Sequence, residues 1–393
     1  MSQYLLINRI RVQNANAIAG FTWGFPSITH FMGFAHNLSR KLSESGFSGF
    51  ELSGCGVVAH DHHVHTYSGS RFTQSKNPAY FMADVDKVLK GKTPSIIEEG
   101  KMNMMVSLLI GFDGFLGNQA DSFIEWVKKQ CLLQRLAGGT ILTIEKIHIF
   151  DIEEKNKFFL LKRKLLPGFA LMDRAGDLAQ HYESNLRENS EAELLDAWLD
   201  FAALKQRARP KSDLITKHLL TQIKNETLSV NVLEAWSAHL DKVPYELDAP
   251  PAVTEYFATL NRNDANQALL KQWQHYLYPT DKTPADWEYL PKPSAGYLVP
   301  IMTGYKAISQ IYDNRDIANT RDSKTPVCFV EATHSVGEWR GVNNFRTAED
   351  IASCLWHYEY QEHWYLCKQR SSEASSQNAI AEDSVTIETP DLN

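Results

Sequence analysis

QNANAIAGFTWGFPSITHFMGFAH, residues 13–36, joins a strand to a helix and sets how the first half of the chain folds. The preceding residues 4–12 alternate as in a half-buried strand, with apolar Ile10 and Val12 and basic Arg9 and Arg11. From residue 27 onward, apolar side chains recur at spacings of three and four, which predicts a helix over residues 27–43. Ser27 is the expected N-cap, and Pro26 before it disfavours an earlier helical start.

The connection between this strand and this helix is about a dozen residues long, more than most strand–helix turns. It carries Asn14, Asn16, Trp23 and Phe25. Two interpretations remain open. The aromatic side chains pack beneath the helix, or the loop opens onto the sheet and binds a ligand.

Composition is that of a globular protein: 393 residues, 43% hydrophobic and 22% charged. The first apolar run is too short for an export signal, and we find no later run of membrane length. The five Cys have no CxxC spacing, so we expect reduced thiols, a cytoplasmic protein and no membrane partner.

Charge is unevenly distributed although the net charge is only −7. Residues 1–182 hold 20 Lys and Arg against 16 Asp and Glu, whereas residues 183–290 hold 11 against 17. The segment 371–393 has five acidic residues and no basic one. Two acidic segments therefore mask a mildly basic first half, which is compatible with a nucleic-acid partner.

The first 150 residues predict six elements in the order strand, helix, strand, strand, helix, strand. Their expected bounds are 4–12, 27–43, 49–66, 102–112, 119–136 and 139–150. Gly54 and Gly56 suggest a bulge in the second strand. The order βαββαβ predicts an α+β fold with a ferredoxin-like domain of the RNA-recognition type. A long arm, residues 67–100, lies between its second and third strands.

By composition, the chain divides into a first domain and three further segments. Residues 1–182 form the expected ferredoxin-like domain, and residues 183–290 form an acidic helical insertion. Residues 291–370 form a smaller C-terminal α/β part that packs on the first domain. Residues 371–393 are Ser-rich and acidic, and we expect them to be disordered.

Two motifs border the predicted sheet. RLAGG, residues 135–139, ends the second predicted helix: one Gly can cap that helix, and two allow close approach to a phosphate or to another strand. KRK, residues 162–164, precedes an apolar turn and can neutralise phosphates, although a solvated charge run is equally compatible.

Four histidines, His60, His62, His63 and His65, alternate along the second strand. Alternation places them on opposite faces, so they cannot converge on one ion, and we expect no metal site. We also find no nucleophile elbow, phosphate-binding P-loop or dinucleotide fingerprint, and we expect no cofactor.

Several longer motifs resemble one known family. They are QNANAI and TWGFPS within 13–27, SLLIG at 107–111, RLAGGTIL at 135–142, KLLPGFAL at 164–171, and GYLVPIMTGYKAIS, TPVCFVE and GEW near the C-terminal end. In this order they resemble the second Csy proteins of type I-F CRISPR–Cas surveillance complexes, the Cas-five-type subunits. The resemblance is weakest over residues 185–290.

The resemblance implies RNA binding without catalysis. Such subunits hold the 5′ handle of the guide RNA, pair with the large subunit beside the backbone subunits, and meet target DNA through the complex. Residues 67–100 would then be the arm that wedges against the guide. The candidate RNA contacts are Asn14, Asn16, Trp23, Phe25, Arg71, Lys76, Arg135, Gly138, Gly139, Lys162, Arg163 and Lys164.

Two other classes of function remain open. A metal-independent RNA endonuclease that processes guide precursors would need a base such as His36, His60 or His62 near a phosphate. A purely structural subunit would be held by protein interfaces alone and would not touch RNA.

Overall fold

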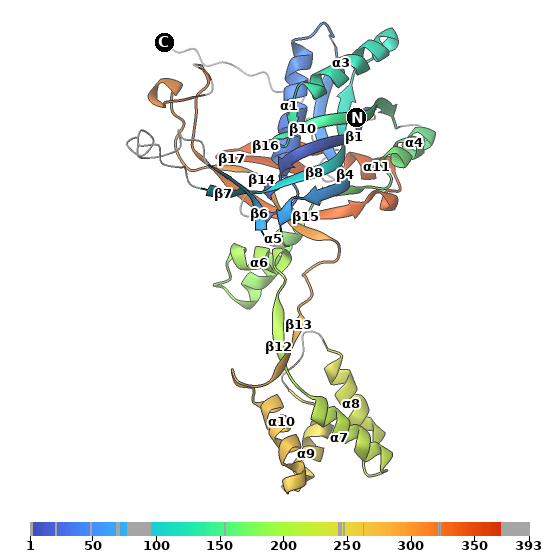
Figure 1. The fold of residues 1–393 in the computed structure, drawn as a ribbon, viewed down its shortest axis with the longest axis vertical. Coiled ribbons are helices and arrows are strands. Elements are labelled where there is room, and N and C mark those ends of the chain that lie inside the picture. The colour runs from blue at the N-terminus through green and yellow to red at the C-terminus, as the bar shows by residue number, and fades with distance from the viewer. Residues whose placement is uncertain are drawn as a thin grey trace. The chain divides into compact units, whose positions relative to one another are not determined.

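The computed structural model describes residues 3–19, 22–47, 49–67, 71–76, 96–152, 155–242, 246, 248–261, 263–320, 322 and 324–370. It divides into two compact units, one of residues 1–192 with 296–393 and one of residues 193–295 (Figure 1). The predicted tail 371–393 lies outside the described residues. The second unit begins ten residues after the predicted boundary, because α5 (Ala175–Glu188) packs against strand β15 (Val330–Gly341) of the first unit.

Four long antiparallel strands form the centre of the first unit, and they lie side by side in the order β4-β8-β1-β10. The chain forms α1 between β1 and β4, and α3 between β8 and β10. The mixed α+β class predicted from the sequence is confirmed. The bounds are β1 (Gln3–Asn16), α1 (Ile28–Ser43), β4 (Glu51–Val64), β8 (Lys101–Asp113), α3 (Ala120–Leu132) and β10 (Gly139–Asp151).

One face of these strands is covered by α1 and α3. The helical spacing in α1 holds, because Phe31, Met32 and Leu38 are buried in one cluster with Ile10 of β1 and Val106 of β8. Each such side chain contributes about 1.5–3 kcal/mol when it leaves water. Ser27 occupies the predicted N-cap position, with its hydroxyl bonded to the side chains of Thr29 and His30.

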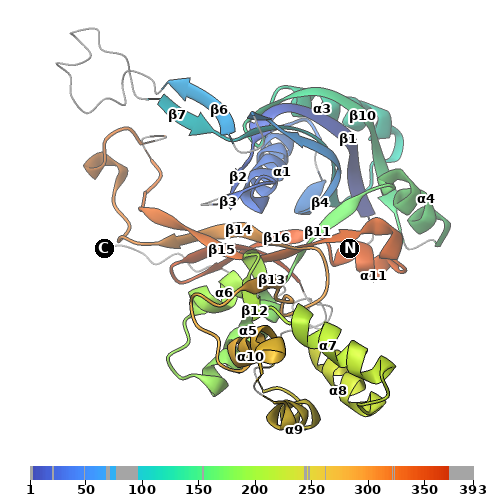
Figure 2. The ribbon, with the colours of Figure 1, turned by 60° about the horizontal axis from the view of Figure 1, so that its bottom comes forward.

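The C-terminal part continues the same ten-stranded sheet, in the order β11-β15-β14-β17-β16. Both of its ends reach β4, since Ala170 of β11 pairs with Val58 and Trp356 of β16 pairs with Cys55. Helix α1 therefore lies between two layers of one sheet (Figure 2). The bounds are β11 (Phe169–Asp173), β14 (Leu298–Ala307), β15 (Val330–Gly341), β16 (Trp356–Gln361) and β17 (Trp364–Gln369).

A second core lies on the opposite face of the central strands, but only at one end. Helix α4 (Lys155–Leu165) and the short α11 (Ala348–Ala352) pack there over Tyr4, Leu6 and Leu109. Among the described residues of this unit, the short 3-10 turns are η2 (Gly117–Gln119), η4 (Asn314–Asp316) and η5 (Val342–Asn344). Because the cover stops at this end, the rest of the face is open.

The predicted bulge in the second strand is confirmed, since the register of β4 against β8 shifts between Ser53 and Gly56. The second helix was predicted too long. It ends at Leu132, and Arg135–Leu136 form a short strand, β9, that turns back onto β10. The turn residues Ala137 and Gly138 have φ of 49° and 75°, as a tight two-residue hairpin turn requires.

The region of the predicted arm is described only in part. Strands β5 (Thr66–Tyr67), β6 (Arg71–Lys76) and β7 (Ile96–Glu99) pair as a small antiparallel sheet, whereas residues 68–70 and 77–95 lie outside the described residues. Two further short strands, β2 (Ile18–Ala19) and β3 (Thr22–Trp23), form a ribbon between β1 and α1.

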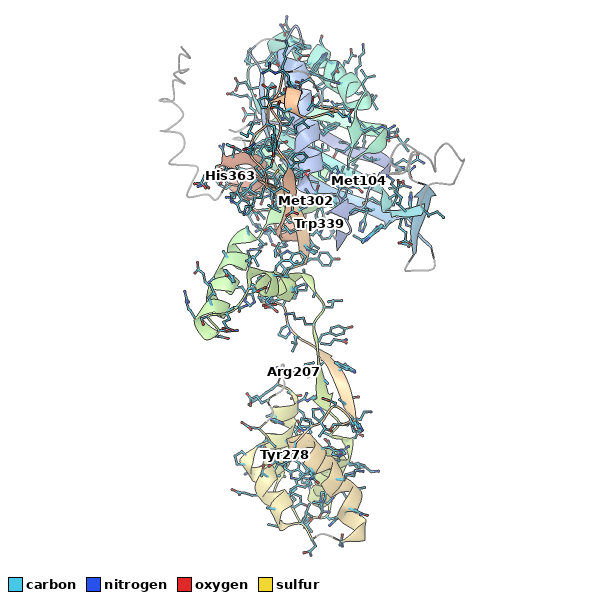
Figure 3. All side chains as sticks on the ribbon, turned by 90° about the vertical axis from the view of Figure 1, so that its left-hand side faces the viewer. Met104, Arg207, Tyr278, Met302, Trp339 and His363 are labelled. Carbon is cyan, nitrogen blue, oxygen red and sulfur yellow. The ribbon has the colours of Figure 1, made fainter. Side chains whose placement is uncertain are left out.

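The second unit has its own core, in which Phe257 stacks on Trp273 at 4.3 Å and Trp236 is fully buried. It is mostly helical and also contains a two-stranded ribbon; Figure 3 labels Arg207 in the ribbon and Tyr278 after the last helix of this unit. The bounds are α6 (Leu194–Ala202), β12 (Gln206–Pro210), α7 (Asp213–Lys224), α8 (Val230–Leu240), α9 (Pro251–Thr259), η3 (Asp264–Asn266), α10 (Gln267–Leu277) and β13 (Ala285–Tyr289). None of the helices described here is long and apolar enough to cross a membrane.

Candidate nucleic-acid interface

The open face of the central strands carries a row of acidic, apolar, basic and polar side chains. Asp61, Met105, Arg11 and Thr143 are register partners across β4, β8, β1 and β10. Arg11 and Thr143 are exposed, and Met105 is half-buried. These residues alternate with core residues such as Val12 and Val106, which is why they lie on the outer face.

A hollow of about 360 Å³ lies in this face, lined by Arg9, Arg11, Met105, Thr143 and Glu145. Arg9 sits at a bulge of β1 with φ of 47°, where the register against β8 shifts between Ile7 and Ile10. Its Nη2 donates to the carbonyl oxygen of Leu166 at 2.9 Å, and its Nε lies 3.6 Å from the Glu145 carboxylate. The Arg9 guanidinium is therefore held in place beside the hollow.

A histidine fastens the turn after α4 to the sheet. Nδ1 of His60 lies 2.7 Å from the Pro167 carbonyl oxygen, and Nε2 lies 2.7 Å from Oγ of Ser107. Burial lowers the pKa of His60, with the Pro167 carbonyl opposing this effect and Arg9 adding to it. In the neutral form that burial favours, Nδ1 carries the proton and donates it to the Pro167 carbonyl oxygen, which can only accept.

The KRK cluster lies in the last turn of α4, and its three cations have different surroundings. Lys162 Nζ donates to the carbonyl oxygens of Asn343 at 3.0 Å and Phe345 at 2.6 Å, so Lys162 joins α4 to the segment after β15. Arg163 is exposed. Lys164 lies near His148 of β10 and helps, after burial, to lower the pKa of that histidine.

His148 adds a polar atom to the same end of the open face. Its Nε2 is buried, and no hydrogen-bond partner for it is found within the described part of the chain. Burial is the main cause of its lowered pKa, and Lys164 and Lys146 act in the same direction. The Glu145 carboxylate opposes the two lysines, so charges of both signs surround His148.

The RLAGG segment makes a close approach to a strand, one of the two roles the sequence left open. A Cβ on Gly139 would lie 2.6 Å from Val12 Cγ1 and 2.7 Å from the Ala15 nitrogen. The Ala137 carbonyl accepts a hydrogen bond from the Asn16 nitrogen at 2.8 Å. The expectation that a Gly caps the second helix was wrong, because that helix ends three residues before Arg135.

The polar residues of the first loop have local partners. Both polar atoms of the Asn16 amide bond the backbone of Ile18, at 2.9 and 3.1 Å. Asn14 has φ of 55°, and its backbone N–H donates to Oδ1 of Asn103 at 3.1 Å. Asn16 therefore shapes the turn into the β2–β3 ribbon.

The two aromatic candidates of this loop differ in exposure. Trp23 is 40% exposed, and its ring lies against Gly100. Phe25 is partly buried, with ring centroids 5.6 Å from Phe31 and 4.8 Å from Trp339. Trp23 can offer ring surface to a ligand, whereas the Phe25 ring is engaged in packing.

The arm candidates are placed by backbone register alone. Arg71 pairs with Tyr67 at the start of β6, and Lys76 pairs with Ile96 at its end.

The residues that line the hollow were not predicted as site residues from the sequence. The signal was present, because Arg9 and Arg11 flank a core isoleucine in a strand whose other face is apolar.

The alternative residues for catalysis and metal binding are also placed. His36 lies in a separate hollow of about 240 Å³, on the helix-covered side, with His357 and Arg370. His63 and His65 have ring centroids 5.9 Å apart. In the described ranges, no group of three or more His, Cys, Asp or Glu could hold a metal ion.

Comparison with known proteins places the chain in a class and then in a family. A family model described as CRISPR-associated protein (Cas_Csy2) matches residues 5–236 and 250–367, and so includes most of the segment where the resemblance looked weakest. The CRISPR-associated protein Csy2 of Pseudomonas aeruginosa (strain UCBPP-PA14) is 31% identical over 374 residues, 90% of each chain. The protein is therefore CRISPR-associated. It belongs to the Csy2 family, which implies a subunit of a type I-F CRISPR complex.

Proposed function

We propose that the open face of the β4-β8-β1-β10 strands binds the 5′ handle of the guide RNA. The observation that carries this proposal is the uncovered face itself, with Arg9, Arg11 and Lys164 around it, in a chain of the Csy2 family. Arg and Lys side chains neutralise phosphates, and in RNA-binding sheets of this kind one face contacts the single-stranded RNA.

We further propose that these strands with α1 and α3 are a ferredoxin-like domain. In chain order the strands are first β1, second β4, third β8 and fourth β10, so their order in space is 4-1-3-2. Both helices cover the same face, which leaves the other face for RNA. The β5–β7 region, with Arg71 and Lys76, is the proposed base of the arm that wedges against the guide.

The large subunit of the complex is the proposed protein partner, next to the backbone subunits and with target DNA reached through the complex. Support comes from large exposed apolar side chains that lie in β16 or in the segments just before and after β14 and before β15: Tyr297, Ile308, Ile311, Phe329 and Tyr360. Exposed apolar patches of this kind mark protein interfaces. The guide is bound without cleavage in this proposal, because both ring nitrogens of His60 are engaged within the fold.

The test is guide binding by the assembled complex with two cations removed from the open face. Arg11→Ala combined with Lys164→Ala is expected to weaken guide binding at least tenfold. Lys128→Ala combined with Lys129→Ala, on exposed positions of α3, is the charge-matched control and should bind normally. Equal affinity for the two double variants would contradict the proposal.

A further inference from the structure

The hollow in the open face contains a carboxylate where a surface for phosphate alone would have none. Glu145 lines it together with Arg9 and Arg11, and the Glu145 side chain is 58% exposed. A carboxylate in the hollow would repel a phosphate bound there, because both groups are negatively charged. Glu145 is therefore suited to a different part of a nucleotide.

The position of Glu145 is fixed by its neighbours. Arg9 is anchored to the Leu166 carbonyl and lies 3.6 Å from the carboxylate, so it orients Glu145. The half-buried thioether of Met105 lies one strand beyond Arg11, and Thr143 lies on the other side of Arg11. The lining of the hollow thus combines a thioether, one carboxylate and one exposed guanidinium, within a volume of about 360 Å³ that admits a nucleobase.

We propose that this hollow binds a guanine base of the guide RNA, with Glu145 accepting hydrogen bonds from the guanine N1–H and 2-amino groups. An ionised carboxylate only accepts hydrogen bonds and has two oxygens side by side. Guanine alone among the four RNA bases presents two adjacent N–H donors on its Watson–Crick edge. Proteins read single-stranded RNA by hydrogen bonds to that edge of an unstacked base.

The remaining groups of the hollow complete the recognition. Met105 packs against the base, and the Arg11 guanidinium faces the phosphate or the ring. This inference rests on the proposed function, because it assigns base selectivity to the same RNA-binding face. It adds that the face discriminates between bases, which phosphate contacts do not do.

The test uses the full-length chain with its large-subunit partner, purified without guide. Fluorescent octauridylates that carry one central guanosine, inosine or adenosine serve as probes. Inosine lacks only the 2-amino group of guanosine. The guanosine probe is expected to bind about tenfold more tightly than the inosine probe, as one hydrogen bond to a charged group would give.

Two variants separate base reading from general binding. Glu145→Gln should bring the ratio of guanosine to inosine affinity close to one. Glu125→Gln, which removes an exposed carboxylate on α3, should leave the ratio unchanged. Equal binding of the three probes to the unaltered chain would overturn the inference, and so would a uniform gain of affinity in Glu145→Gln, which marks a phosphate site. Failure of every probe to bind would contradict the proposed function as well.

Discussion

Arg9 and Leu166 are 157 positions apart in the chain, yet Nη2 of Arg9 donates to the Leu166 carbonyl oxygen at 2.9 Å. This bond and the His60–Pro167 contact hold the turn after α4 against the central strands. The basic end of α4 is thereby kept beside the open face. A residue of the first strand and a motif far along the chain thus contribute to one surface.

Salt dependence should reveal which cations of this surface touch phosphate. Each phosphate neutralised on a single strand contributes roughly −0.7 to the slope of log affinity against log salt. We expect Arg11→Ala with Lys164→Ala to flatten that slope by about 1.4. Guide affinity measured at several salt concentrations on the assembled complex checks this, and a slope equal to that of Lys128→Ala with Lys129→Ala would remove both cations from the RNA site.

Lys162 should matter for stability more than for RNA. Its ammonium donates to two carbonyl oxygens, and both of these charge-assisted bonds are lost with the side chain. Lys162→Ala is therefore expected to lower the free energy of unfolding by about 1–3 kcal/mol. Arg163→Ala, at the exposed neighbouring position, is the matched control and should unfold like the unaltered protein in urea. Equal stability of the two variants would contradict the structural role of Lys162.

Alanine variants of Trp23 and Phe25 should distinguish a ring that stacks on an RNA base from a ring that packs in the core. Phe25→Ala removes a ring held between Phe31 and Trp339, and should lower stability by about 2–4 kcal/mol. Trp23→Ala removes a partly exposed ring, and should weaken guide binding by about 1–3 kcal/mol if a base stacks on it. Melting and binding measured on both variants test the pair, and a Trp23→Ala variant with unchanged affinity would assign Trp23 to packing alone.

His357 should make the first unit sensitive to acid. Burial, assisted by Arg370, lowers its pKa from 6.5 to about 4 in the folded protein. Above pH 6.5 the imidazole is neutral in both states, so its contribution to stability is complete there. As the pH falls toward about 4, His357 binds a proton in the unfolded chain but stays neutral in the folded chain. The contribution of His357 to stability is therefore lost over this range.

His357→Gln should consequently show a smaller drop in melting temperature between about pH 7 and about pH 5 than the unaltered protein. His363→Gln, at the turn between β16 and β17, serves as a control. An identical pH profile for His357→Gln and the unaltered protein would show that His357 does not titrate as its burial requires.

Local patterns sufficed for the elements of the first half. The alternation around Ile10 and the helical spacing of Phe31 and Leu38 depend on single faces, and these faces are buried as expected. The glycines at 54 and 56 marked the bulge because irregular pairing favours them. Composition showed the helical character of the second unit, but its ribbon pairs β12 with β13, 75 or more residues apart, and no local signal reports such pairing.

The candidate site was harder to predict than the fold, because basic residues with different roles look alike in sequence. Lys162 and Lys164 are two positions apart, but Lys162 is bonded to backbone carbonyls while Lys164 lies near His148. The hollow around Arg11 exists because α4 and α11 stop short of it, which only the packed structure reveals.

The central claim, that guide RNA lies on the open face of β4-β8-β1-β10, is tested most directly by crosslinking. Guide RNA with photoreactive handle nucleotides would be crosslinked in the assembled complex, and the attached peptides identified by mass spectrometry. Crosslinks are expected on peptides of β1, β8 and β10 that contain Arg11, Met105 or Thr143. Crosslinks confined to α1, α3 or the second unit, with none on these strands, would contradict it.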